Sequence, residues 1–259
     1  MDFKGVSLAT IKDSFKDVNI EDINDEVIEV LLNDERKNVK AFGNTLKNKK
    51  NKHNEVLKKM HLMYSFDLSY GKDLVICGVD EVGRGPLAGP IVGAAVIVDY
   101  KNRNLLGVRD SKKLSEEKRE ELSEIIKREA IAYCIYEISE KDIDSKGIAY
   151  CNNEVLFRAY KGLNKKVDLV LSDGYPVKHI DTDNRFVVKG DDKSIAIACA
   201  SILAKVYRDN LMKRYSEKYP YYGFEHNAGY GTKDHIEGLK KYGPCEIHRR
   251  SFIKNFSGE

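Results

Sequence analysis

The spacing of apolar positions changes after the first seventy residues. Before that point, apolar residues recur at helical intervals, as at Val56, Met60 and Met63, and no run rich in β-branched residues interrupts them. The pattern predicts two or three small helices. We therefore expect residues 1–70 to form a helical N-terminal extension and residues 71–259 to form the main domain.

Strands and helices alternate in the main domain. Short apolar runs predict five strands, at 73–80, 90–98, 131–139, 167–173 and 185–191. Helical spacing predicts helices at 115–130, over most of 140–163, and at 194–215. The last of these is rich in small residues, which let a helix lie close to a sheet. This order predicts an α/β layered domain with a mixed sheet, in which the first two strands are antiparallel neighbours.

Acidic residues end three of the predicted strands. Asp80 and Glu81 follow the first strand, and Asp173 and Asp191 end the fourth and fifth, each near a glycine. One acid at a strand end is usually just solvated, but ligand sites of α/β sheets lie beyond the carboxyl ends of strands. We therefore expect the four carboxylates to converge, and their repulsion to force some of them to protonate unless cations lie among them. Without a His or Cys cluster, oxygen ligands favour Mg²⁺ or Mn²⁺ over zinc.

Such a site is typical of phosphate chemistry. Two divalent ions about 4 Å apart can activate water and stabilise the leaving oxygen of a phosphodiester. The chain has no G-x-x-x-x-G-K-[ST] loop, which argues against a nucleoside triphosphatase. Asp80 and Glu81 add a geometric condition, because neighbours in a regular strand point to opposite faces. We expect the strand to end or bend there so that both acids serve one site.

Charge is distributed unevenly along the N-terminal extension. The net charge of the chain, +3, permits a nucleic-acid partner without requiring one. Residues 1–35 contain three Lys and ten Asp or Glu, whereas residues 36–59 contain nine Lys or Arg and a single Glu. The basic segment either contacts a phosphate backbone or forms a solvated helix face, and the sequence leaves both readings open.

Cysteine usage and hydropathy indicate an intracellular protein. The five cysteines are scattered and never form a C-x-x-C pair, so neither a disulfide framework nor a zinc site is expected. The uncharged run at 87–98 is too short to span a bilayer, and the N-terminus lacks the order of a signal peptide. We expect a cytoplasmic protein with no membrane partner, and a monomer by default.

Several segments resemble bacterial ribonuclease HII, in sequence and in order. They span about 74–252 and read GVDEVGRGPLAGPIVGAAVIV, DSKKLSEEKREEL, LSDG, KGDDKSIAIACASILAKVYRD, YYGF, AGYGTKDH and GPCEIHRRSF. The resemblance implies a ribonuclease H-like fold, a five-stranded mixed sheet flanked by helices. It implies cleavage of RNA in RNA/DNA hybrids and on the 5′ side of single ribonucleotides in duplex DNA, leaving 3′-hydroxyl and 5′-phosphate ends. Roles in DNA replication and ribonucleotide excision repair follow.

In this family, an acidic quartet holds two Mg²⁺ or Mn²⁺ ions, and it falls here on Asp80, Glu81, Asp173 and Asp191. The sister enzyme, ribonuclease HIII, usually has Glu as its fourth acid and lacks a Gly-Arg-Gly tripeptide. The fourth acid here is Asp191, and the tripeptide is present, so the resemblance favours HII.

Recognition of RNA within DNA requires sensing a 2′-hydroxyl. By resemblance, Gly83, Arg84, Gly85 and Tyr230 form the sensor, with the Tyr230 ring packing against the sugar of the next deoxynucleotide. The two glycines let the backbone pass close to a sugar-phosphate.

Other polar positions have two readings each. Ser111 and Lys112 precede a helix and suit phosphate contact, although an ordinary capping turn remains open. Lys205 either contacts substrate or pairs with a helix acid. The basic segment 248–251 either contacts phosphate or forms a structural ion pair. Asn227 stands where the family commonly has His, which puts a substrate contact in doubt.

Two other functions compete with a junction ribonuclease. A hybrid-binding protein that has lost the chemistry would gain nothing from four repelling acids. A resolvase or transposase on the same fold would not need the Gly-Arg-Gly loop and Tyr230. Both features therefore favour the ribonuclease.

Overall fold

The computed structural model of the chain describes residues 3–101, 105, 107–108, 111 and 114–255. It divides into two compact units, Met1–His61 and Leu62–Glu259, and α3 (Lys37–Leu68) contributes to both. Within the described ranges, no helix is long and apolar enough to cross a bilayer.

The first unit is helical, as its apolar spacing predicts, but its last helix is much longer than expected. The elements are α1 (Leu8–Ser14), the 3₁₀ turn η1 (Ile20–Asp22), α2 (Asp25–Leu32) and α3. Helix α3 runs for 32 residues, so the expectation of only small helices is wrong. No proline interrupts it, and Gly43 is used for packing: a Cβ there would lie 3.0 Å from the Cβ of Leu31.

The second unit contains the predicted five-stranded mixed sheet. Its order is β3-β2-β1-β4-β5, with β1 antiparallel to β2, β2 antiparallel to β3, and β4 parallel to both β1 and β5. The strands are β1 (Ile76–Val82), β2 (Ile91–Ile97), β3 (Ala132–Ile138), β4 (Leu169–Asp173) and β5 (Asp183–Val187). The antiparallel pairing of the first two strands is confirmed.

The fifth strand ends earlier than its apolar residues predict. We expected it at 185–191, but the backbone leaves the extended region at Lys189, which is left-handed with φ of 56°. A 3₁₀ turn, η3 (Gly190–Asp192), follows. Asp191 therefore lies in a turn rather than at the end of a strand.

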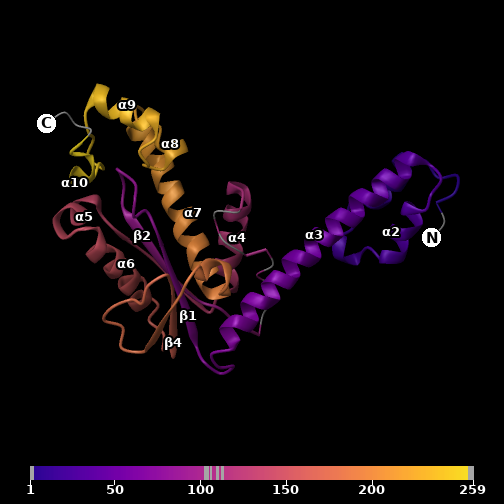
Figure 1. Ribbon diagram of the computed structural model, residues 1–259, viewed down its shortest axis with the longest axis horizontal. Coiled ribbons are helices and arrows are strands. Elements are labelled where there is room, and N and C mark those ends of the chain that lie inside the picture. Colours follow the sequence, from indigo (N-terminus) through magenta and orange to yellow (C-terminus); the bar gives the residue numbers. More distant parts are fainter. Residues whose placement is uncertain (1–2, 102–104, 106, 109–110, 112–113, 256–259) are drawn as a thin grey trace. The chain divides into compact units, whose positions relative to one another are not determined.

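Helices cover both faces of the sheet (Figure 1). On one face lie α5 (Glu140–Lys146) and α6 (Ile148–Gly162); on the other lies α7 (Ile195–Lys218), with α4 (Glu116–Glu129) packed against it. The short helices α8 (Phe224–Asn227), α9 (Lys233–Tyr242) and α10 (Arg250–Ile253) complete the unit.

Strand β1 approaches α7 at backbone distance. A Cβ atom at Gly78 would lie 2.1 Å from the carbonyl carbon of Ala196, so only glycine permits the contact. Most residues of the first four turns of α7 are buried, which agrees with the small, apolar composition of 194–215.

A buried acid from the last turn of α3 holds the start of α7. Asp67 is fully buried, and its Oδ2 accepts hydrogen bonds from the amide of Ala196, at 3.0 Å, and the hydroxyl of Tyr100, at 2.9 Å. A carboxylate suits the positive end of a helix dipole. Burial nevertheless raises the pKa of Asp67 to about 6, although hydrogen bonds to Ser194, Ala196 and Tyr100 oppose the rise.

This pKa predicts a pH dependence of stability. Because the pKa of Asp67 is higher in the folded chain than the usual 3.8, the folded state holds the proton more tightly, and the free energy of unfolding falls as pH rises from 4 to 7. The loss is about 3 kcal/mol for this group. Asp67→Asn removes it, so the variant should gain stability relative to wild type as pH rises. Urea unfolding of both proteins at several pH values measures this, and a difference independent of pH would contradict it.

Candidate active site

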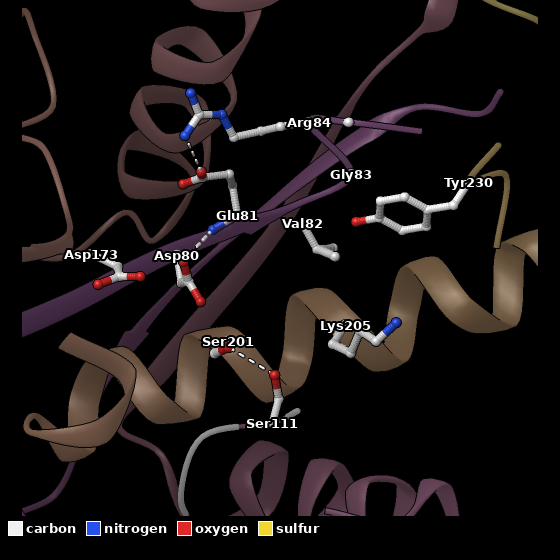
Figure 2. A pocket seen from close by; sticks show the side chains of 11 residues that line it. Asp80, Glu81, Val82, Gly83, Arg84, Ser111, Asp173, Ser201, Lys205 and Tyr230 are labelled. Carbon is white, nitrogen blue, oxygen red and sulfur yellow. Dashed lines mark hydrogen bonds and ion pairs between the residues drawn. The ribbon is translucent and has the colours of Figure 1, made fainter. Parts of the chain in front are cut away.

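A pocket of about 480 Å³ lies at the carboxyl end of β1 (Figure 2). Its lining residues are Asp80, Glu81, Val82, Gly83, Arg84, Gly85, Ser111, Asp173, Ser201, Lys205 and Tyr230. Three of the four predicted acids and six of the seven predicted substrate-binding residues therefore share one pocket. The seventh, Lys112, lies outside the described residues.

Strand β1 neither ends nor bends at its acids, so that expectation is wrong. Asp80 and Glu81 both remain paired with β2, and β1 continues to Val82. Asp80 points toward α7 and Glu81 points to the opposite face, as in any regular strand (Figure 2).

The two acids share a pocket because β4 is shorter than β1. The pairing of β1 with β4 ends at Val79 and Ser172. Beyond that point β1 is still paired with β2 on one edge, but its other edge has no paired strand among the described residues. A side chain on either face can reach this open edge. Glu81 also meets Arg84 there, with Nη1 and Oε1 3.7 Å apart.

Asp80 is under electrostatic strain. Its side chain is buried, and burial together with the charge of Glu81 raises its pKa well above the usual value. The charge of Asp173 raises it further, whereas hydrogen bonds from Ser201 and from the amide of Glu81, at 2.8 Å, lower it. A cation beside these carboxylates would relieve the repulsion.

The remaining two acids are linked through a backbone amide. Asp173 Oδ1 accepts a hydrogen bond from the amide of Gly190, at 2.7 Å, and Asp191 follows directly in η3. Asp191 is buried and does not line the pocket. Among the described residues, no three His, Cys, Asp or Glu side chains are gathered tightly enough to hold an ion as placed. Asp80, Glu81 and Asp173 thus share the pocket, whereas Asp191 lies in η3 and does not line it.

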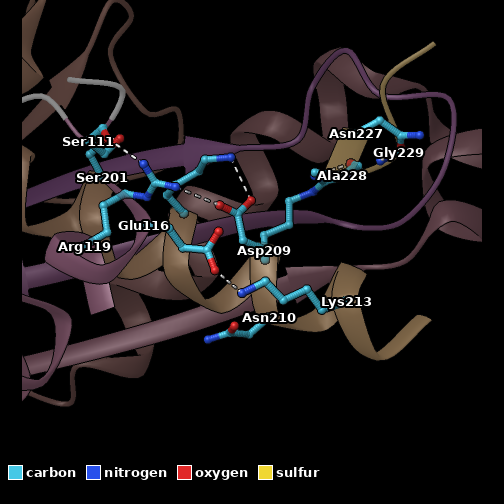
Figure 3. Close-up of polar contacts among 12 residues, drawn as sticks. Ser111, Glu116, Arg119, Ser201, Asp209, Asn210, Lys213, Asn227, Ala228 and Gly229 are labelled. Atoms are coloured by element: carbon cyan, nitrogen blue, oxygen red, sulfur yellow. Dashed lines mark hydrogen bonds and ion pairs between the residues drawn. The ribbon is translucent and has the colours of Figure 1, made fainter. Parts of the chain in front are cut away.

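Helix α7 supplies the polar floor of the pocket. The hydroxyls of Ser201 and Ser111 are 3.0 Å apart (Figure 2). One turn further along, Lys205 Nζ lies 2.7 Å from Asp209 Oδ1. The other oxygen of Asp209 is 3.6 Å from Arg119 of α4 (Figure 3). Lys205 therefore forms the ion pair with a helix acid that the sequence allowed. It also lines the pocket, and its contact with substrate stays a prediction.

Two buried arginines hold the loop that leaves β1. Arg208 donates from Nε to the carbonyl of Pro90, at 2.9 Å, and from Nη2 to Ala88, at 3.1 Å. Arg249 donates from Nη2 to the carbonyl of Gly83, at 2.6 Å, and from Nη1 to Arg84, at 3.0 Å. Gly83, with φ of 97°, is required here because a Cβ atom would lie 2.4 Å from Arg208 Nε.

Both arginines remain charged at neutral pH. Burial lowers the pKa of Arg208 to about 10, and burial with the nearby charge of Arg208 lowers that of Arg249 to about 9. Arg249 donates to carbonyl oxygens and, within the described ranges, does not form the ion pair considered from the sequence. Arg208 follows Ser201 by seven residues and Lys205 by three, so it lies on the same face of the helix. This spacing is the sequence signal that could have indicated that Arg208 supports the pocket.

Tyr230 lies across the pocket from the acids and next to Gly85. Its ring carbon Cε1 would be 3.7 Å from a Cβ at Gly85, and the side chain is 45% exposed. Asn227 supports the turn before it: its Nδ2 donates to the carbonyl of Tyr222, and its Oδ1 accepts from the amide of Gly229. Asn227 does not line the pocket.

Comparisons with known proteins agree with the resemblance seen in the sequence. The model of the family described as ribonuclease HII matches residues 77–255, and that described as the ribonuclease HII N-terminal domain matches residues 7–71. Ribonuclease HII of Clostridium perfringens strain SM101 is 57% identical over 232 residues, which cover 89% of this chain and 85% of that protein. Ribonuclease HII of Clostridium beijerinckii is 51% identical over 260 residues, covering 97% and 96%.

The fold agrees as well. The crystal structure of ribonuclease H2 from Pyrococcus horikoshii matches with a TM-score of 0.60 and 27% identity, over 70% of this chain and 96% of that one. With the family model spanning most of the chain and the fold in place, this chain belongs to the ribonuclease HII family and is a ribonuclease H.

Proposed function

We propose that this ribonuclease H nicks duplex DNA on the 5′ side of single embedded ribonucleotides and cuts the RNA strand of RNA/DNA hybrids, leaving 3′-hydroxyl and 5′-phosphate ends. One observation supports this above others: a single pocket joins three carboxylates to the Gly-Arg-Gly loop and Tyr230. An enzyme of this kind must cut a phosphodiester and recognise a 2′-hydroxyl beside it. The pocket provides residues suited to both tasks.

Asp80, Glu81, Asp173 and Asp191 would hold two divalent cations, Mg²⁺ or Mn²⁺. The donor set fits, because the lining residues offer carboxylate and hydroxyl oxygens and include no His or Cys. The raised pKa of Asp80, caused by burial and by the charge of Glu81, has the sign expected where a cation belongs. When bound, such ions lower the pKa of water and stabilise the leaving oxygen of a phosphodiester.

The residues around the acids would bind and orient the substrate. Lys205 and Ser111 face the pocket and would contact phosphates, as would Lys112 by its place in the sequence. The backbone of Gly83, Arg84 and Gly85 would contact the ribose of the ribonucleotide. Tyr230 would pack its ring against the neighbouring deoxyribose.

The wider setting follows from the family. We propose that residues 71–259 form the catalytic domain and that the protein is a cytoplasmic monomer. Its substrates would be ribonucleotides left in DNA, which places it in DNA replication and ribonucleotide excision repair.

The proposed function predicts a specific cut. In a DNA duplex containing one ribonucleotide, the enzyme should nick on the 5′ side of that ribonucleotide with Mg²⁺ or Mn²⁺, and EDTA should abolish the nick. Gel mapping of the labelled product to the nucleotide measures this. Cleavage confined to runs of several ribonucleotides would reject the junction specificity while keeping the nuclease.

Replacing one acid tests the metal site. Asp80→Asn removes a charge with little change of volume, so we expect weaker Mn²⁺ binding in calorimetry and a loss of cleavage of at least about a hundredfold, since even outer-shell partners of metal ligands cost 10- to 100-fold. The metal-free variant should unfold at a higher temperature than wild type, because the charge on Asp80 is repelled by Glu81 and Asp173.

A matched control is Asp192→Asn, which alters an acid in η3 that does not line the pocket. It should leave Mn²⁺ affinity and cleavage near the wild-type values. If Asp80→Asn cleaved at the wild-type rate, Asp80 would not belong to the site. If the wild type itself did not cut, a hybrid-binding protein would be favoured instead.

The basic segment of the first unit supports an additional, nonspecific contact. Lys47 and Lys50 form ion pairs with Glu29 and Asp25, at 3.1 and 2.9 Å. Lys40, Lys49 and Lys52 are exposed and pair with no acid among the described residues. Free lysines along one segment are suited to phosphates.

We therefore predict that replacing Lys40, Lys49 and Lys52 with Gln weakens hybrid binding and flattens its salt dependence by up to about three units of slope, with the cut position unchanged. Removing residues 1–70 would be a poorer test, because it also deletes Asp67, which holds α7. The control is Lys47→Gln, because Glu29 already neutralises the charge of Lys47. Fluorescence anisotropy at several salt concentrations measures the slope, and an unaltered slope would reject the contact.

A further inference from the structure

The proposed sensor has two parts, the 83–85 backbone and Tyr230. Two consecutive residues outside the pocket, His248 and Arg249, hold these parts in place. Both side chains are buried, at 1% and 0% exposure. Arg249 binds the loop that contains Gly83 and Arg84, and His248 reaches toward Tyr230 through a second histidine. Neither residue lines the pocket.

The loop is fixed by its carbonyl groups. The guanidinium of Arg249 donates to the carbonyls of Gly83, Arg84 and Gly89, at 2.6, 3.0 and 2.9 Å. In a trans peptide the C=O and the following N–H point in opposite directions. Drawing the first two carbonyls toward Arg249 therefore turns the amides of Arg84 and Gly85 away from it, toward the side on which a ligand can be bound.

The backbone beside Arg249 adds further contacts. The amide of Arg249 donates to the carbonyl of Leu87, and the amide of Gly89 donates to Ile247, both at 2.8 Å. The amide of Leu87 in turn donates to the carbonyl of Gly229, also at 2.8 Å, directly before Tyr230. The loop thus lies between the C-terminal segment and the Tyr230 turn.

Two histidines connect this segment to Tyr230. His235 Nδ1 is 2.9 Å from the carbonyl of Tyr230, and His235 Nε2 is 2.9 Å from His248 Nε2. The amide of Cys245 donates to His248 Nδ1, at 2.9 Å. The rings are surrounded by Tyr222 and Phe224.

These contacts allow one arrangement of protons for neutral rings. A carbonyl only accepts, so His235 carries its proton on Nδ1; an amide only donates, so His248 has no proton on its Nδ1. His248 therefore carries its proton on Nε2 and donates it to His235 Nε2. A second proton on either ring would place two hydrogen-bond donors face to face. Burial also disfavours the charged rings: it lowers the pKa of His235, and it lowers that of His248 to about 3.

We propose that His248 and Arg249 are positioning residues for ribonucleotide recognition: Arg249 orients the 83–85 backbone, and His248, through His235, fixes the carbonyl of Tyr230. The inference rests on the proposed function, because it concerns the sensor of that same pocket. It assigns discrimination between substrates to two residues that do not line the pocket.

Arg249→Lys separates geometry from charge. Lysine keeps the charge but cannot bind three carbonyls with one planar fork. The readout is kcat/KM for a duplex with a single ribonucleotide, divided by kcat/KM for a hybrid with a run of ribonucleotides. We expect this ratio to fall about tenfold, equivalent to one lost positioned contact, with Mn²⁺ affinity unchanged. Arg250→Lys, at an exposed neighbouring arginine, is the matched control and should keep the wild-type ratio.

Two replacements of His248 test the connection to Tyr230. The amide of Asn can replace Nδ1, which accepts from Cys245, and the longer Gln can replace Nε2, which donates to His235. His248→Gln should therefore keep most of the ratio and His248→Asn should lose it. Thermal melting identifies any variant that does not fold.

A measurement on the wild type does not depend on any variant. Nitrogen-15 NMR of labelled histidines should show His235 protonated on Nδ1 and His248 protonated on Nε2. The opposite tautomers would overturn the histidine part of the proposal. An unchanged ratio in Arg249→Lys, or an equal loss on both substrates, would overturn the arginine part, since a purely structural residue affects both alike.

Failure of the proposed function can be distinguished from failure of this inference. A wild type that does not nick the single-ribonucleotide duplex would reject the junction function, and the inference with it. A wild type that nicks this duplex, together with an Arg249→Lys variant that keeps the wild-type ratio, would reject the inference alone.

Discussion

The backbone contact between β1 and α7 is the constraint on which the rest of the site depends. Only a glycine at position 78 allows the strand to lie so near the carbonyl of Ala196. At that distance, successive turns of α7 bring Ser201 beneath Asp80 and Arg208 beneath the loop that leaves β1. The helix therefore forms the floor of the pocket and supports its recognition loop at the same time, which is why a change in helix position would affect both.

Opposite charges occupy separate parts of this site. Asp80, Glu81 and Asp173 gather at the open edge of β1, whereas Arg208 and Arg249 lie under the loop. Both arginines donate to carbonyl oxygens, so no carboxylate neutralises them in those contacts. Buried charges of this kind are costly for folding. Fold stability is therefore a poor reason for either group. In the proposed function, the acids would hold cations, and the arginines position the backbone of the recognition loop.

The parts of the structure that depend on local patterns could be predicted from the sequence. Strand runs located the sheet and brought Asp80 and Asp173 to one edge, because the period of a strand and its end are visible in neighbouring residues. The position of Asp191 depends on a left-handed backbone at Lys189, which hydrophobicity does not encode. Arg249 was not assigned because its partners are carbonyls some 160 residues away, and a carbonyl belongs to every residue alike.

A junction between RNA and DNA is defined by two adjacent sugars, so recognition depends on the spacing between the two groups that contact them more than on the place of either alone. In the proposed function those groups are the 83–85 backbone and Tyr230. We infer that Arg249 and His248, one peptide bond apart, fix that spacing. Asp80, Glu81 and Asp173, in contrast, lie in strands of the sheet. Although α7 supports both regions, a change at Arg249 or His248 can then alter discrimination without moving these three acids.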